Sequence, residues 1–293
     1  MKSPFDKSSL QHLPDTPGVY LFYGPANELL YVGKSKTIRT RVRSHFSARE
    51  EAWLMRRVRR VETRETAGEL GALLLESQLI KELRPMFNVA SRRRRRIIIA
   101  RRVENPKGYA GIVLEAVDRI DISNSSPIMA IFKHNTQAKE YLTAVARTHR
   151  LCPKLLRLDN SRKHCFWYHL GRCDGACMGE DDVAGYNARV EEAFAARRFK
   201  AWPYQSGVVF EERSADGNKR ERFFIDNWCL IASHRYVNGG VQEQVPGSHR
   251  FDYDSYKILY DFLTAEENRK AIRLLDRDRF DKAWRESELH IDV

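Results

Sequence analysis

The feature that most constrains the fold is a pair of β-rich runs joined by a tight turn near the N-terminus. Residues 18–23 and 29–32 are the two runs, and the residues between them include Gly-Pro-Ala-Asn at 24–27, a combination that favours chain reversal. Side chains alternate along a strand, so Tyr20 and Phe22 share one face of the expected hairpin. The sequence therefore predicts a small antiparallel sheet with one aromatic face, which flanking helices have to cover.

A short helix is expected directly after the hairpin. Ser35 or Thr37 can cap it, because both side chains accept hydrogen bonds from the free N–H groups of a first turn. An apolar stripe recurs every fourth residue, at Ile38, Val42 and Phe46. Arg41 and His45 lie one turn apart beside this stripe, so we expect them at the border between the helix and the sheet.

A longer helix is predicted to begin at Thr66, with Glu69 in the capping-box position. It is expected to end at Arg84, because the residue before a proline avoids the α region. Glu76 projects beside the apolar face of this helix. A carboxylate there loses water and needs a partner, either a basic side chain or a divalent cation. The helix alone favours an ordinary ion pair over a metal.

Two tyrosines, two cations and one carboxylate are thus expected around one sheet: Tyr20, Tyr31, Lys34, Arg41 and Glu76. Such a set suits hydrolysis of a phosphodiester. The carboxylate holds a divalent metal, a phenol deprotonated near the metal activates water, and the cations neutralise charge in the transition state. The alternative is that the tyrosines of the hairpin serve packing alone.

The positive charge of the chain lies in its first third. The sequence has 51 basic and 39 acidic side chains, a net charge of +12, and residues 1–102 contain 22 of the basic and 10 of the acidic ones. The rest of the chain is therefore neutral. This excess favours a polyanionic partner for the N-terminal part, nucleic acid before an anionic membrane surface. A solvated basic surface is the alternative.

Composition excludes several classes of protein. With 42% hydrophobic and 31% charged residues, the chain is typical of globular rather than disordered proteins. No apolar run approaches the ~18 residues of a membrane span, and the N-terminus lacks the apolar core of a signal peptide. We therefore expect a cytoplasmic protein with reduced cysteines and no membrane partner.

Four of the five cysteines lie in one short segment: Cys152, Cys165, Cys173 and Cys177. In a reduced protein such clustering favours a metal or redox site over disulfides. The segment lacks the Cys-x-x-Cys pair that indicates a zinc ribbon, and small buried hydrophobic side chains are the alternative. We do not expect His164 or His169 to bind a metal, and we expect Cys229 in a core.

The motifs resemble those of the GIY-YIG nucleases. Two spaced tyrosine motifs are followed by a lysine, by a helix with an arginine and by a glutamate on a later helix. The resemblance is closer to the N-terminal half of the excision-repair endonuclease UvrC. It rests on Pro17-Gly-Val-Tyr20, Tyr31-Val-Gly-Lys-Ser-Lys36, Leu73-Leu-Leu-Glu76 and Arg84-Pro-Met-Phe-Asn88.

The resemblance implies a role for each matching residue. Tyr31 matches the tyrosine that acts as the general base, and Tyr20 matches the one near the scissile phosphate. Lys34 and Arg41 match the cations around the nucleophile and the phosphate. The expected centre therefore cleaves DNA by activating water next to a neutralised phosphate.

Three further site residues follow from the same resemblance. Glu76 matches the sole protein ligand of one Mg²⁺ or Mn²⁺, and Asn88 matches a residue that closes the site. The family usually has a tyrosine where this chain has His45. We expect His45 in the site all the same, with a pH dependence near neutrality that a tyrosine would not give.

The cysteine-rich segment, residues 165–177, also resembles a segment that follows the nuclease domain in UvrC proteins. There the cysteines are associated with an iron–sulfur cluster bound by four thiolates. The resemblance therefore implies a [4Fe-4S] cluster on Cys152, Cys165, Cys173 and Cys177. Zinc in the same position is the alternative.

Two groups of arginines are expected to bind DNA. One group is the tract Arg92, Arg93, Arg94, Arg95 and Arg96. The other is Arg56 and Arg57, on a basic helix expected over residues 51–60. Each neutralised phosphate releases counterions, so such side chains strengthen binding without regard to sequence. For the tract, a solvated loop is the alternative.

We expect an α+β protein with three parts. Residues 1–103 form the GIY-YIG domain, a short antiparallel sheet with flanking helices. Residues 104–200 form a connecting α/β segment that contains the four-cysteine region, 152–177. Residues 201–293 form a second small α+β domain. This layout leaves no room for the second nuclease of UvrC and resembles the short UvrC homologues.

The resemblance implies a role in nucleotide excision repair, within the SOS response to DNA damage. The expected reaction is a single metal-dependent incision 3′ to a lesion in double-stranded DNA that a UvrA-dependent complex has loaded with UvrB. One alternative is a structure-specific GIY-YIG nuclease that acts without UvrB. Another is a DNA-binding adaptor without catalytic activity.

Overall fold

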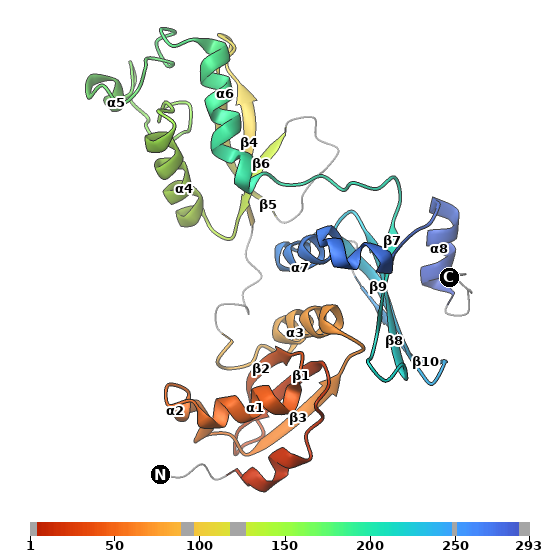
Figure 1. Ribbon diagram of the computed structural model, residues 1–293. Coiled ribbons are helices and arrows are strands. Elements are labelled where there is room, and N and C mark those ends of the chain that lie inside the picture. The colour runs from red at the N-terminus through yellow and green to blue at the C-terminus, as the bar shows by residue number, and fades with distance from the viewer. Residues whose placement is uncertain (1–4, 89–96, 118–126, 248–250, 287–293) are drawn as a thin grey trace. The chain divides into compact units, whose positions relative to one another are not determined.

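The chain folds into two units, each built from antiparallel sheets and helices (Figure 1). One unit combines residues 1–94 with 202–293, and the other is residues 95–201. The α+β class expected from the sequence is confirmed. The computed structural model describes residues 5–88, 97–117, 127–247 and 251–286.

A three-stranded antiparallel sheet forms the N-terminal part of the first unit. Its strands are β1 (Gly18–Tyr23), β2 (Leu29–Ser35) and β3 (Arg60–Glu65), in the order β2-β1-β3. The predicted hairpin is confirmed, and Asn27 in its turn has a left-handed backbone, with φ of 61°. Strand β2 lies at an edge of this sheet.

Helices cover both faces of the N-terminal sheet. They are η1 (Lys7–Gln11), α1 (Ile38–Ser47), α2 (Ala52–Met55) and α3 (Glu69–Leu83). Helix α1 packs on the face that carries Tyr20 and Phe22, whereas α3 packs on the face that carries Val19 and Leu21. The alternation predicted along the first strand therefore separates two small cores.

Two expectations for this part are wrong. The basic helix expected over residues 51–60 is only the four residues of α2, because the chain enters β3 at Arg60. Helix α3 begins at Glu69 with Gly68 as its N-cap, not at Thr66. The Thr66 hydroxyl donates instead to the Gly68 carbonyl oxygen at 2.8 Å, so no capping box forms.

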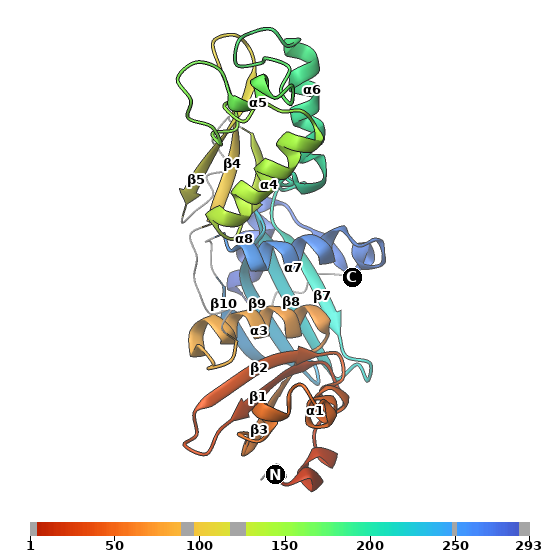
Figure 2. The same cartoon turned by 90° about the vertical axis from the view of Figure 1, so that its left-hand side faces the viewer.

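The C-terminal part of the first unit is a five-stranded antiparallel sheet with helices. In chain order its elements are β7 (Val208–Arg213), β8 (Lys219–Asp226), β9 (Cys229–Val237), β10 (Gly240–Pro246), α7 (Tyr253–Thr264), η3 (Glu266–Ala271), β11 (Ile272–Leu274) and α8 (Arg277–Arg285). The strand order is β10-β9-β8-β7-β11. Figure 2 shows α3 between this sheet and the N-terminal one.

The apolar pattern of residues 266–289 predicts one helix, but the described part of this segment contains η3, β11 and α8 instead. Strand β11 interrupts that segment and pairs with β7. Helix α8 then has a start of its own, because the Asp276 side chain accepts from the Arg279 N–H at 2.8 Å. The apolar residues that suggest one helix therefore serve two elements.

The second unit has a three-stranded antiparallel sheet, in the order β5-β4-β6. Its elements are β4 (Ile97–Glu104), β5 (Ala110–Val117), β6 (Ile128–Phe132), α4 (Asn135–Thr148), α5 (Phe166–His169), α6 (Val183–Phe194) and η2 (Ala195–Arg197). Cys152, Cys165 and Cys173 belong to the core that joins the sheet, α4 and α6.

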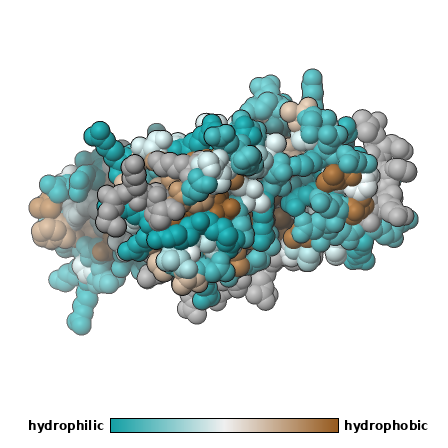
Figure 3. Space-filling model, turned by 90° about the horizontal axis from the view of Figure 1, so that it is seen from below, coloured by the Kyte–Doolittle hydropathy of each residue, from teal (hydrophilic) through white to brown (hydrophobic). Residues whose placement is uncertain are grey.

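Figure 3 shows hydrophilic side chains over most of one face, with apolar ones in separate small groups. Among the described residues, no helix is long and apolar enough to cross a bilayer.

Candidate active site

The candidate site lies around β2, at the edge of the N-terminal sheet. Tyr20 and Tyr31 belong to the core on the α1 face, and their ring centroids are 6.3 Å apart. Glu76 comes from α3, which covers the opposite face. It reaches β2 because the Lys34 N–H donates to Glu76 Oε1 at 3.0 Å. The edge strand therefore brings phenols and a carboxylate together from its two sides.

A chain of hydrogen bonds holds Tyr20 on the α1 face. The Tyr20 hydroxyl lies 2.6 Å from His45 Nε2, and His45 Nδ1 contacts the carboxylate of Glu51. An ionised carboxylate only accepts, so Nδ1 carries the proton and Nε2 accepts from the Tyr20 hydroxyl. Burial lowers the pKa of His45, and Glu51 opposes this shift only in part. The imidazole is therefore neutral, and both of its nitrogens have partners.

Glu51 is a member of the site that the sequence did not single out. The expected basic helix treats residues 51–60 as a cationic surface. Yet Glu50 and Glu51 are the only acidic residues between Arg39 and Arg60. An acidic pair just after a histidine, within an otherwise basic segment, is the signal that could have found it.

The two phenols are held in their neutral form. Burial raises the pKa of both Tyr20 and Tyr31, and the negative charge of Glu76 adds to the shift at both. The positive charge of Arg41 opposes the shift at both phenols. A phenolate at Tyr31 therefore needs more positive charge than Arg41 supplies.

Glu76 is the site residue with a carboxylate oxygen available to a ligand. Burial raises the pKa of this carboxyl, with the Lys34 N–H and the Lys34 charge acting against the shift. Within the described part of the chain, no Lys or Arg side chain lies at ion-pair distance from Glu76. The ordinary ion pair that the helix pattern favoured is therefore absent there. One half-buried carboxylate with an oxygen left over fits a hard cation that keeps most of its waters.

The Lys34 side chain has a different partner. Its Nζ lies 2.9 Å from Glu69 Oε1, and Lys36 Nζ lies 2.6 Å from Glu69 Oε2. Glu69 and Glu76 are seven residues apart, two turns of one helix, so they share a face of α3. Both carboxylates therefore contact Lys34 near the end of β2: Glu69 binds its side chain, and Glu76 binds its backbone N–H.

Asn88 fastens the chain to the outer edge of β2. Its Oδ1 accepts from the Val32 N–H at 2.9 Å, and its Nδ2 donates to the Val32 carbonyl at 2.9 Å. The residue expected to close the site thus lies beside the strand that carries Tyr31. Its amide is occupied by backbone groups.

The expected DNA contacts are only partly within the described residues. Arg56 and Arg57 are exposed, and the Arg57 guanidinium lies 5.5 Å from the centroid of the Phe87 ring. Trp53, which is 48% exposed, packs edge-on against the same ring. The tract 92–96 lies outside the described residues.

Three of the four clustered cysteines form a compact group in the second unit, and the fourth, Cys177, contacts its backbone. The sulfur atoms of Cys152, Cys165 and Cys173 all lie within 4.8 Å of one another, and Cys177 Sγ accepts from the Cys165 N–H at 3.4 Å. Hydrogen bonds from the Cys152 thiol and from backbone N–H groups lower the pKa of Cys173 to about 6. A thiolate prepared in this way, beside further thiols, fits a metal centre.

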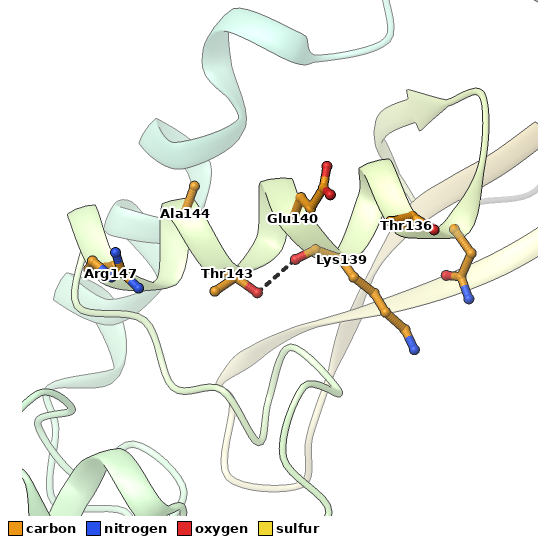
Figure 4. A pocket seen from close by; sticks show the side chains of 7 residues that line it. Thr136, Lys139, Glu140, Thr143, Ala144 and Arg147 are labelled. Carbon is orange, nitrogen blue, oxygen red and sulfur yellow. Dashed lines mark hydrogen bonds between the residues drawn. The ribbon is translucent and has the colours of Figure 1, made fainter.

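Other features of the described residues fall outside both sites. His164 and His169 face each other, with Nε2 atoms 2.5 Å apart, and neither joins the sulfur group. Cys229 is buried in the C-terminal core, as expected. A hollow of about 520 Å³ runs along α4, and all of its lining residues belong to that helix (Figure 4). It is an open helix surface rather than a catalytic cleft.

A three-stranded antiparallel sheet with two tyrosines on one face, and a glutamate helix on the other, defines a GIY-YIG endonuclease. Three family models match the chain: UvrC-like GIY-YIG domain at residues 16–89, UvrC/Cho excinuclease, middle domain at 100–196, and Excinuclease Cho C-terminal domain at 207–279. The chain belongs to the Cho family of excinucleases. It is therefore a DNA endonuclease with a role in excision repair.

The chain is similar to individual curated proteins and to one solved domain. Excinuclease cho of Escherichia coli (strain K12) is 34% identical over 86% of this chain and 84% of that protein. UvrABC system protein C of Desulforudis audaxviator is 36% identical over 62% of this chain and 30% of that protein. The GIY-YIG domain of UvrC from Thermotoga maritima, solved with magnesium, is 31% identical over 28% of this chain and 93% of that chain, with a TM-score of 0.26.

Proposed function

We propose that the protein makes a single metal-dependent incision 3′ to a lesion, in double-stranded DNA that a UvrA-dependent complex has loaded with UvrB. The observation that carries the catalytic part is the open oxygen of Glu76, which shares the end of β2 with the two phenols. The repair part rests on membership of the Cho family. Such a role places the protein with the chromosome in the cytoplasm.

The cation is Mg²⁺ or Mn²⁺, held by Glu76 alone among the protein groups. When bound, it supplies positive charge that polarises the scissile phosphate and lowers the pKa of nearby groups. The chain's own groups then do the rest. Arg41 faces both phenols, and Tyr31 takes the proton from the attacking water once the surrounding charge favours its phenolate.

Tyr20 acts through its position. The Tyr20 hydroxyl donates its hydrogen bond to His45 Nε2. The Tyr20 oxygen therefore stays oriented toward Arg41 and Tyr31. Lys34 stabilises negative charge at the end of β2, and Glu69 keeps its ammonium in place. Asn88 keeps β2 in register with the segment that follows α3. Each proposed residue thus has a separate task.

The protein binds DNA through the phosphate groups of the DNA backbone. Arg56, Arg57 and the tract Arg92–Arg96 are the proposed contacts, in line with the concentration of positive charge in residues 1–102. Charge reversal within 92–96 is expected to weaken binding and to flatten its salt dependence. Charge reversals after residue 200 are expected to have a much smaller effect on DNA binding and on its salt dependence.

The four cysteines are proposed to hold a [4Fe-4S] cluster, with zinc as the alternative. Thiolate character at Cys173 and burial among apolar side chains support a permanent centre of either kind. The visible spectrum of protein purified without oxygen separates the two. A broad absorption band that disappears on reduction supports the cluster, whereas bound zinc without colour contradicts it.

Nicking of a lesion-bearing duplex, with and without UvrA and UvrB, tests the proposed function. We expect one cut on the 3′ side, which depends on both Mg²⁺ and UvrB. Equal cutting of branched DNA without UvrB would instead support a structure-specific nuclease. End-labelling of each strand locates the cut and decides its side.

A further inference from the structure

Helix α3, which carries Glu76, starts without a cap of its own. Its N-cap residue is Gly68, which has no side chain to accept from the first turn. A second glycine, Gly71, lies in that turn, although glycine inside a helix costs about 1 kcal/mol relative to alanine. Read alone, this sequence describes a helix that should fray at its beginning.

The missing cap comes from the C-terminal part of the same unit. The Leu70 N–H donates to Glu212 Oε1 at 2.8 Å, and the Gly71 N–H donates to Glu212 Oε2 at 2.9 Å. These are the second and third N–H groups of the helix, the two that an N-cap side chain would bind. Glu212 belongs to β7, more than a hundred residues further along the chain.

A second carboxylate approaches the same helix end. The Glu221 carboxylate of β8 lies beside Gly71 in the first turn, and the nearby Ala67 N–H is one of the groups that oppose the rise of its pKa on burial. The positive end of a helix dipole favours such negative charge. Burial nevertheless raises the pKa of Glu212 to about 7, because two N–H donors only partly replace lost water. Among the described residues, no Lys or Arg side chain pairs with Glu212, so the helix end is what holds it.

The two glycines are explained by these carboxylates. A Cβ on residue 68 would lie 2.5 Å from the carboxyl carbon of Glu212, and a Cβ on residue 71 would lie 2.7 Å from Glu221 Oε2. Larger residues would push the acidic side chains away. The weak start of α3 and the acidic strands of the C-terminal part therefore fit each other.

The cap lies next to the catalytic groups. Glu69, the residue before the capped N–H groups, holds Lys34, and Glu76 follows on the same face. The far end of α3 is tied to the C-terminal part as well, because Lys81 pairs with Asp252. A helix fixed at both ends presents its side chains in one orientation.

We propose that the C-terminal part is a positioning element of the nuclease site, in which Glu212 caps α3 and thereby holds Glu69, Lys34 and Glu76 in place against β2. The link to metal binding rests on the proposed role of Glu76. Glu212 touches neither phosphate nor metal, so it is a positioning residue.

The first test replaces Glu212 by alanine in the full chain, with Glu211→Ala as the matched control. Glu211 is its neighbour on β7, and its carboxylate pairs with Arg213 and Arg222 instead of α3. Two quantities are measured: hydrogen exchange at the Leu70 and Gly71 amides, and the Mn²⁺ concentration for half-maximal nicking. Glu212→Ala is expected to lose amide protection and to need about fivefold more Mn²⁺, the ratio that matches a lost cap of about 1 kcal/mol. Glu211→Ala is expected to change neither.

The second test is a rescue. Serine at position 68 can cap α3 locally once Glu212 is gone, so Gly68→Ser should restore protection and Mn²⁺ dependence in the Glu212→Ala protein. In the otherwise unchanged protein, Gly68→Ser should lower amide protection and raise the Mn²⁺ concentration needed for half-maximal nicking, because the Cβ of the serine collides with Glu212. Failure of the rescue, or an equal effect of Glu211→Ala, would overturn the proposal. Amide protection decides the cap even where Glu76 proves not to bind metal, so the two proposals fail separately.

Discussion

The two faces of the N-terminal sheet differ in how the polar groups of the site are satisfied. On the α1 face, Tyr20, His45 and Glu51 form a closed chain in which each group has a partner. On the α3 face, Glu76 has one backbone donor and an oxygen to spare. A closed network fixes geometry, whereas an open carboxylate binds something from outside. The comparison shows that one face of the sheet orients the Tyr20 phenol, while the other face keeps a carboxylate available for a ligand.

Removing the open carboxylate should have the largest effect. Glu76→Gln keeps the size of the side chain but loses its charge, so we expect metal-dependent nicking to fall about 10³-fold while DNA binding survives. The measurement is single-turnover nicking over a range of Mn²⁺ concentrations. Glu82→Gln is the control, because Glu82 lies on the same helix and is exposed. Undiminished nicking by Glu76→Gln would sink the assignment of this face.

Breaking the closed chain should cost less and in another way. Glu51→Gln removes the charge that fixes the His45 tautomer, and a charge-assisted hydrogen bond is worth about 1.5–3 kcal/mol. We therefore expect about tenfold slower nicking and lower stability in urea, with the Mn²⁺ dependence unchanged. Glu50→Gln is the matched control. A changed Mn²⁺ dependence in the Glu51 variant would show that the two faces are not separate.

The closed chain should also respond to acid. The pKa of His45 is lowered in the folded protein, mainly by burial, so the unfolded chain binds this proton more readily. Stability from this group is complete above the unfolded pKa of about 6.5 and declines as the pH falls toward the folded value, by at most about 1.4 kcal/mol per pH unit. Urea unfolding at several pH values measures the slope. His45→Tyr should flatten it, and an unchanged slope would contradict the neutral imidazole.

The smallest effect is expected at the Lys34–Glu69 pair. Both side chains are partly exposed, at 32% and 25%, and ion pairs of this kind contribute at most about 1 kcal/mol. Glu69→Gln should therefore slow nicking about twofold to threefold, with a weaker effect at high salt. Nicking at two ionic strengths measures it. A loss as large as that of Glu76→Gln would mean that Glu69 itself belongs to the metal site.

Local patterns predicted much of this site. The alternation of side chains along β1 places Tyr20 on the face opposite α3. The helical periodicity of α3 places Glu76 at the border of the apolar face of that helix. The end of α3 at Arg84 follows from the proline behind it. Each of these depends on a few neighbouring residues, which is why sequence alone was sufficient.

The rest depends on partners distant in the sequence. The sequence predicts a start of α3 at Thr66, but the cap of the helix comes from Glu212, which no pattern near residue 66 can reveal. No local pattern marks the contact of Glu51 with His45, because this contact forms only when α1 folds. The free oxygen of Glu76 is likewise a property of the assembled sheet edge.

The segment after α3 has a consequence for self-association. An open strand edge is a template on which another chain can add a strand. Here the Met86 and Phe87 N–H groups donate to the Leu29 and Leu30 carbonyls, and Asn88 occupies both backbone groups of Val32. The edge of β2 is thus covered between Leu29 and Val32 by the Asn88 carboxamide and by backbone N–H groups of the same chain. This part of the edge, beside Tyr31, therefore offers a second copy of the chain fewer free backbone groups on which to add a strand.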